Sequence, residues 1–316
     1  MTKGLQSRQN STVIKRRWIK PRDFFVLIAL VPGTILACLL PRRMLIPTCG
    51  LLSRFLPVGL FDFSSPKQIA RALEITVKQA RGIMRNSITA RLTALLAFLR
   101  AKFRAPPFDI TIEGTEHIDA ALAQGHGVVL WLADLVYTNY VQYIALRENG
   151  YTPSHLSRPE HGFSDTKFGL TFLNPIRQNF ELKYLRERIV YRRESPNEAG
   201  ALIRQRLSGN GVVSIYASGY EGRKFVELDF LSGRLKVAAG APGIAYKQGC
   251  PILPVFAVPN PDPLDFKVTI GKPLKLDNED KDKAISEATE DFFGRLAPMV
   301  KQRPELFRAW SAMSTN

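Results

Sequence analysis

The chain has 316 residues, enough for one large domain or two modest ones, and its 45% hydrophobic and 10% aromatic content is ample for a core. This composition excludes a chain that is disordered throughout. The formal net charge of +16 indicates an anionic environment or partner, which could be nucleic acid, anionic lipid headgroups or an acidic carrier protein.

The first predicted element is an apolar segment that directly follows a basic run. The 17 residues from Phe24 to Leu40 carry no charge, and apolar residues continue to Phe61. This length is the lower limit for a membrane-spanning helix, and Pro32-Gly33 would kink or break the helix in the absence of a packing partner. We expect residues 1–62 to be a basic N-terminus with a hydrophobic helical membrane anchor that spans once or dips in as a kinked hairpin.

Two other interpretations of this segment remain open. A signal peptide is disfavoured because no small-residue cleavage site follows, and Pro41-Arg-Arg43 stands in its place. The segment could also be a buried helical arm of a soluble domain. Basic residues on both sides leave the orientation undetermined by the positive-inside rule.

Residues 63–105 are predicted to form a helical arm. Serine can cap a helix that starts near Pro66, apolar residues then recur at helical spacing through Met84, and a second helical segment runs from Asn86 to Phe103. The other face is basic and could be solvated or contact lipid headgroups. Pro106-Pro107 ends the arm.

Residues 106–316 alternate between strand and helix patterns. Strands are predicted at 110–114, 127–132, 150–156, 188–191, 211–216, 251–258 and 266–270. Helices are predicted at 117–123, 138–148, 198–207 and 280–301, with a helical and irregular region at 166–184. The alternation indicates an α/β domain with a mostly parallel sheet covered by helices on both faces.

The most informative strand pattern is Gly127-Val-Val-Leu-Trp-Leu-Ala-Asp134, which reads as a buried strand. It brings polar residues to its carboxyl end, where α/β folds place their chemistry. Asp134 stands at that end, and Asn139 follows five positions later.

Five segments, taken in order over residues 105–310, resemble the lysophospholipid acyltransferase superfamily, and in particular its lipid A late (lauroyl/myristoyl) acyltransferase branch. They are the turn and strand from Gln124, Leu156-Ser-Arg-Pro159, the block from Gly211 to Arg223, the block from Phe230 to Val255, and Lys301-Gln-Arg-Pro-Glu-Leu-Phe-Arg-Ala-Trp310. In that family a catalytic His and an acidic residue stand where this chain has Asp134 and Asn139.

The resemblance implies a membrane-associated O- or N-acyltransferase on the cytoplasmic face of a cell inner membrane. In the family the His acts as general base on an acceptor hydroxyl, which attacks an acyl thioester. The implied partners are an acyl carrier protein or coenzyme A thioester as donor, a lipid or glycolipid acceptor, and an anionic membrane surface. A hydroxyl with a pKa near 15 does require a nearby base.

Three interpretations of Asp134 and Asn139 remain open: an enzyme with an altered base, a catalytically inactive member with a lipid-binding or complex-forming role, or rescue by another His. A carboxylate is a weak base at neutral pH unless burial raises its pKa. Among the histidines, His155 is the best placed because it is predicted to end the strand after Asp134, and His161 follows in the same loop. His117 falls in a predicted surface helix and His126 at the opposite end of the strand.

Further residues are candidates for binding the substrate. Arg158 and Arg223 are favoured for a phosphate, because guanidinium binds phosphate in a bidentate way. Ser218 and Glu221 belong to the block from Gly211 to Arg223 that resembles the family. Salt bridges with nearby glutamates, and a plain turn at residues 221–223, are the alternative explanations.

No cofactor or metal is expected. A dinucleotide site is disfavoured because no Gly-x-Gly-x-x-Gly opens a helix after a strand. Cys38, Cys49 and Cys250 lack metal-ligand spacing and are expected to be reduced, as suits a cytosol-facing protein. Nucleic-acid binding is disfavoured because the positive charge is dispersed and no known module appears.

Overall fold

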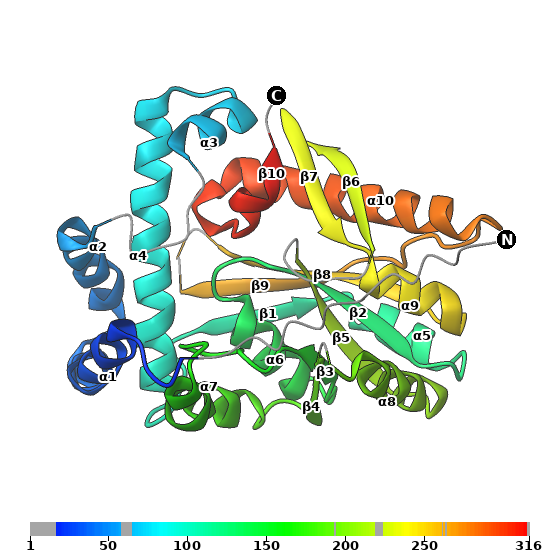
Figure 1. Ribbon diagram of the computed structural model, residues 1–316, viewed down its shortest axis with the longest axis horizontal. Coiled ribbons are helices and arrows are strands. Elements are labelled where there is room, and N and C mark those ends of the chain that lie inside the picture. The colour runs from blue at the N-terminus through cyan, green and yellow to red at the C-terminus, as the bar shows by residue number, and fades with distance from the viewer. Residues whose placement is uncertain are drawn as a thin grey trace, which may run out of the picture.

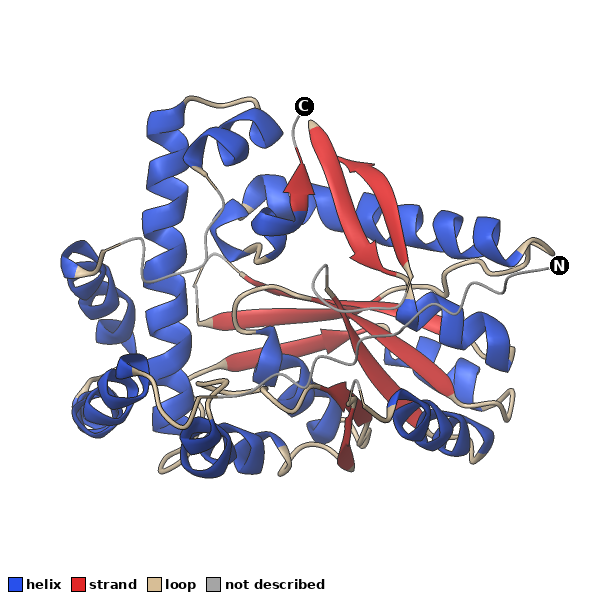
Figure 2. Cartoon of the chain, viewed as in Figure 1, coloured by secondary structure: helices blue, strands red, loops and turns tan. Residues whose placement is uncertain are grey.

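The computed structural model describes residues 17–57, 65–192, 194–218, 224–260, 262 and 264–314. Its centre is a seven-stranded sheet with the order β1-β9-β8-β2-β5-β3-β4, accompanied by a three-stranded sheet with the order β10-β7-β6 (Figure 2). The strands of the large sheet are β1 Asp109–Glu113, β2 Val128–Ala133, β3 Ser154–Ser157, β4 Glu187–Val190, β5 Val212–Ala217, β8 Ile252–Pro259 and β9 Asp265–Ile270. Those of the small sheet are β6 Phe225–Phe230, β7 Gly233–Ala238 and β10 Met313–Ser314.

The described helices surround these sheets (Figure 1). They are α1 Pro21–Leu39, α2 Leu45–Phe55, α3 Pro66–Leu73, α4 Val77–Ala101, α5 Thr115–Leu122, α6 Thr138–Glu148, α7 Asn174–Glu181, α8 Pro196–Ser208, α9 Gly240–Gln248 and α10 Lys281–Gln302. A π-helical turn, Gly169–Leu173, leads into α7. The three cysteines are all described and all free of disulfides.

The large sheet is mostly parallel, as predicted. Every neighbouring pair is parallel except β8 with β9. Only the few residues between Pro259 and Asp265 connect those two strands, and a connection this short permits only an antiparallel pair. The carboxyl ends of β2, β5 and β3 therefore meet at one edge of the sheet.

Helices cover both faces of the large sheet, which confirms the second part of the fold prediction. Trp131 of β2 packs on Phe292 of α10, with ring centroids 4.3 Å apart. Tyr216 of β5 is in register with Leu132, so it points to the opposite face, where its ring contacts Tyr143 of α6.

The N-terminal helices pack against α4 (Figure 1). α1 continues through Pro32, because α4 is its packing partner: a Cβ on Gly33 would lie only 3.4 Å from Leu99 Cδ1. Asp23 joins the start of α1 to the loop after β3, since it accepts hydrogen bonds from Ser164 and Thr166.

The N-terminal segment does not provide the predicted spanning helix. Among the described residues, no helix combines the length and the apolar character that a bilayer crossing needs. α1 has 19 residues and carries Asp23 in its first turn. The apolar run is divided instead between α1 and α2, whose inner faces are used to cover α4.

Two boundaries differ from the predictions. The helix predicted to run through Leu73 and Val77 is interrupted at Glu74, which has a positive φ of 56°. A capping box between Thr76 and Gln79 then starts α4. The hairpin of β6 and β7 was not predicted, although its buried Leu228, Phe230, Leu235 and Val237 alternate with polar residues as strands require.

Candidate functional site

The site is centred on Asp134, which directly follows β2. Every residue of β2 is buried, so the strand places Asp134 rigidly at the edge of the sheet. The Asp134 side chain is 12% exposed, and Arg308 Nη1 donates a hydrogen bond to its Oδ1 over 3.0 Å. The carboxylate is thus held in a partly buried ion pair at the carboxyl end of the central strand.

The C-terminal segment supplies Arg308. It pairs with the loop after β2, because Val136 N donates to Leu306 O over 2.8 Å and Leu135 forms an isolated bridge with Phe307. Phe307 also packs edge-on against Trp310 at a centroid distance of 5.0 Å. The two segments therefore fix Arg308 beside Asp134 although 174 positions separate the two residues.

The turn into α6 carries backbone strain. Tyr137 has a φ of 78°, a conformation that costs a bulky residue about 1–3 kcal/mol. Ring contacts with Phe108 and Phe266, at centroid distances of 6.3 and 5.1 Å, hold Tyr137 in place. Strain of this kind concentrates at functional sites, and this instance stands three residues after Asp134.

A cavity of about 260 Å³ opens beside this turn. Its walls combine apolar and aromatic side chains with three arginines, Arg91, Arg177 and Arg308. The remaining lining residues are Ala94, Leu95, Phe98, Val136, Tyr137, Tyr140 and Phe163. Because Arg308 borders the cavity and also binds Asp134, the carboxylate lies next to a space suited to a molecule with one apolar and one anionic part.

A second polar cluster lies near the cavity. Glu181, at the end of α7, is 1% exposed and accepts hydrogen bonds from His161 Nε2 at 2.7 Å and from Arg177 Nε at 2.9 Å. Arg177 also lines the cavity, so it connects the cluster to the cavity wall.

The charges of this cluster favour an ionised Glu181. Burial alone would raise the pKa of Glu181, but the pairs with His161 and Arg177 lower it to about 2. Burial raises the pKa of the nearby Tyr216 hydroxyl, and the charges of Glu181 and Asp134 raise it further. Tyr216 thus lies within electrostatic range of both carboxylates.

His155 lies inside the sheet rather than at its edge. β3 continues to Ser157, two residues beyond His155. The imidazole is 1% exposed, its Nδ1 lies 3.0 Å from Ser214 Oγ, and its ring contacts Tyr143 and Tyr216. Burial, with a smaller effect of His161, lowers the pKa of His155 to about 3, so the ring is neutral at pH 7.

Of the other predicted site residues, Ser218 and Arg158 lie at the same edge of the sheet. Ser218 follows β5, and the β2–β5 register places it next to Asp134. Arg158 follows β3 and is exposed, with its carbonyl accepting a hydrogen bond from Arg188. Asn139 is in the first turn of α6, but its side chain lies outside the described part of the structure. Glu221 and Arg223 lie outside the described residues.

Sequence reasoning did not select Arg308, Arg177 or Glu181. The C-terminal motif contains Arg308, but the motif does not predict which residue pairs with it. Arg177 and Glu181 have the i, i+4 spacing of a helical ion pair. Neither signal distinguishes a buried pair from an ordinary surface pair.

Comparisons with known proteins give a similarity to a solved structure. No protein-family model matches the chain, and no curated protein matches it by sequence. The structure is similar to a crystal structure of the 1-acyl-sn-glycerophosphate (LPA) acyltransferase PlsC from Thermotoga maritima, at 14% identity and a TM-score of 0.37. The match covers 89% of this chain and 100% of that chain.

Proposed function

We propose that the protein transfers a fatty acyl group from a thioester to a lipid or glycolipid acceptor. The observation that carries this proposal is the position of Asp134 at the carboxyl end of β2, beside a cavity lined by aromatic side chains and three arginines. The apolar wall suits an acyl chain, and the arginines suit a phosphate on the donor or acceptor. The ordered sequence resemblance to the lipid A branch supports the same reaction.

In the proposed reaction, Asp134 accepts the proton of the acceptor hydroxyl or amine. The acceptor oxygen or nitrogen forms a bond to the thioester carbonyl carbon, and backbone amides at the strand ends stabilise the oxyanion. The carbon–sulfur bond then breaks, and the departing thiolate takes up the proton held by Asp134, which restores the carboxylate. Arg308 orients the Asp134 carboxylate and is positioned to contact an anionic group in the cavity.

A catalytically inactive lipid-binding role is the second candidate. It is favoured by the Asp134–Arg308 ion pair, which occupies the carboxylate, and by the burial of His155. No histidine lines the cavity beside Asp134.

The wild-type protein separates these two functions. We expect the purified full-length chain to form acylated lipid from radiolabelled acyl-carrier-protein or coenzyme A thioesters and a membrane lipid extract. Thin-layer chromatography of the lipids measures the product, and heat-inactivated protein is the control. If the protein retained labelled lipid but formed no acylated product with either donor, the proposed transfer would be rejected and the lipid-binding function would take its place.

We further propose that the protein works at the cytoplasmic face of a cell inner membrane, attached to the surface of that membrane. Large apolar side chains on the outer face of α1 are exposed, including Ile28 at 69%, Val31 at 63% and Ile35 at 55%. An exposed apolar stripe of this kind indicates an interaction site. With the net charge of +16, an anionic lipid surface is the partner that fits best.

Replacing Ile28, Val31 and Ile35 together by Gln is expected to weaken binding to vesicles about tenfold or more, because each side chain loses apolar burial in the membrane interface. Flotation with phosphatidylglycerol-containing vesicles measures the effect, and circular dichroism checks that the helices remain. Unchanged flotation of the α1 variant would exclude this helix as the attachment surface.

A further inference from the structure

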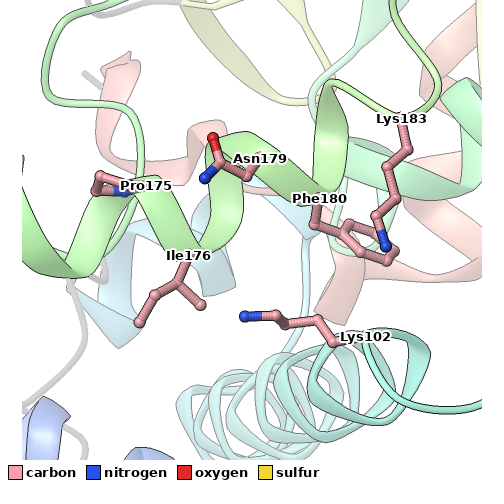
Figure 3. A pocket seen from close by; sticks show the side chains of 6 residues that line it. All are labelled: Lys102, Pro175, Ile176, Asn179, Phe180 and Lys183. Carbon is pink, nitrogen blue, oxygen red and sulfur yellow. The ribbon is translucent and has the colours of Figure 1, made fainter.

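A second cavity, of about 270 Å³, lies between the end of α4 and the helix α7. Lys102 and Lys183 border it, together with Pro175, Ile176, Asn179 and Phe180. Figure 3 shows Lys102 extending from α4 beneath Ile176, and Lys183 lying along the ring of Phe180. No residue lines both this cavity and the one beside Asp134, although α7 contributes Arg177 to the latter, so the two cavities are separate.

Among the residues that the structure describes, no carboxylate pairs with Lys102 or Lys183. Their ammonium groups lie 5.9 Å and 5.8 Å from the ring centroids of Phe103 and Phe180, respectively, so each ammonium group lies over an aromatic ring. Burial lowers the pKa of Lys102, and the positive charge of Lys183 lowers it further. A bound anion would relieve both effects.

Each of the two lysines has an exposed apolar neighbour in the chain. Phe103 follows Lys102 in the chain and is 66% exposed, and Leu182 precedes Lys183 and is 42% exposed. Each lysine therefore stands beside a large apolar side chain that faces outward. This combination matches a ligand whose anionic group is attached to hydrocarbon.

The cavity opens near the helix that we propose to lie on the membrane. Arg100, in the last turn of α4, donates to Leu40 O over 2.6 Å, which brings the end of α1 close to Lys102. In Figure 1, α1 and α7 lie at the same end of α4.

We propose that the Lys102–Lys183 cavity binds the phosphate of an anionic phospholipid headgroup, while Phe103 and Leu182 contact the attached hydrocarbon. This inference rests on the proposed attachment to a membrane surface and names the lipid chemistry that would be recognised there. The phosphate lies between the two ammonium groups, and Asn179 contributes a polar side chain to the same wall.

The test is binding of soluble short-chain lipids to the full-length protein, measured by isothermal titration calorimetry below the micelle concentration. The probes are dihexanoyl-phosphatidylglycerol, dihexanoyl-phosphatidylcholine and inorganic phosphate. The variants are Lys102→Gln with Lys183→Gln, the same pair changed to Arg, and a matched control, Lys275→Gln with Lys301→Gln. The control removes the same two charges from exposed positions outside the cavity.

We expect wild type, the arginine pair and the matched control to bind phosphatidylglycerol, and the Lys102/Lys183 glutamine pair to bind it roughly tenfold to thirtyfold more weakly. Equal binding by the glutamine pair and wild type would overturn the site, as would no binding by wild type. If phosphatidylcholine bound as tightly as phosphatidylglycerol, the site would not recognise anionic charge and the proposal would be rejected. If inorganic phosphate bound as tightly as phosphatidylglycerol, the hydrocarbon would not contribute and the site would be a phosphate site rather than a lipid site.

Acyl transfer in detergent distinguishes this site from the proposed reaction. Neither lysine lines the Asp134 cavity, so the glutamine pair is expected to keep wild-type transfer in detergent. Transfer without headgroup binding would reject only the lysine site. Headgroup binding without transfer by the wild type would reject only the proposed reaction.

Discussion

Replacing Asp134 by Asn is expected to lower the rate of acyl transfer about 10²- to 10⁴-fold, the usual effect of removing a general base. The amide retains an oxygen that can accept the hydrogen bond from Arg308, but it cannot take a proton from the acceptor. The turnover number with a saturating thioester donor measures the effect. Thermal unfolding should stay close to wild type, because the partner Arg308 is 36% exposed and keeps access to solvent when the ion pair is lost.

The matched control is Asp282→Asn, which also removes a carboxylate paired with a cation. Asp282 pairs with Lys224, but its side chain is 66% exposed and it does not line the Asp134 cavity. Its transfer rate should equal that of wild type. If Asp134→Asn left transfer intact while His161→Gln abolished it, the base would be the imidazole that Glu181 holds, and the role of Asp134 would be rejected.

Asp134 could be selected from sequence because its position depends on local pattern. A run of apolar residues bounded by Gly127 predicts a buried strand, and the residue after such a strand must lie at the edge of the sheet. The start and end of α6 were also predicted correctly. The partner of Asp134 could not be predicted, because Arg308 reaches it only through the tertiary pairing of the C-terminal segment with residues 135 and 136.

The histidines show how small errors in a strand boundary change a site. A strand ending at His155 would bring the imidazole to the edge of the sheet, whereas the observed end at Ser157 places it in the core. His161 was considered as part of the same loop. Its pairing with Glu181 depends on how α7 folds back over that loop, which residue spacing does not encode.

The N-terminal segment was misread for a related reason. Seventeen uncharged residues fit either a membrane span or helices that pack on a neighbour, and hydropathy alone cannot separate the two. The fully buried Ala37 and Leu45 belong to a face that covers α4, while Ile28 and Ile35 belong to a face that remains exposed. Only the packing of α4 divides the apolar residues between these faces.

Replacing Glu181 by Gln is expected to destabilise the protein by about 3–5 kcal/mol, the usual cost of breaking a buried ion pair from one side. Glu181 is 1% exposed and is paired with both His161 and Arg177, so its loss leaves the Arg177 charge without its carboxylate. Urea denaturation followed by circular dichroism measures the free energy of unfolding. The exposed Glu290→Gln is the control and should change it by less than about 0.5 kcal/mol.

The Glu181→Gln and Glu290→Gln variants should also differ in how their stability, relative to wild type, depends on pH. The pKa of Glu181 is about 2 in the folded protein, below its ordinary value of 4.5, so its contribution to stability is complete above pH 4.5 and is lost as the pH falls toward 2. The stability difference between wild type and Glu181→Gln should therefore shrink over that interval, whereas that between wild type and Glu290→Gln should not follow this trend. A difference that stayed constant from pH 6 to the acid limit would mean that Glu181 is not held ionised by His161 and Arg177. The cluster would then stabilise the loop after β3 by packing rather than by charge.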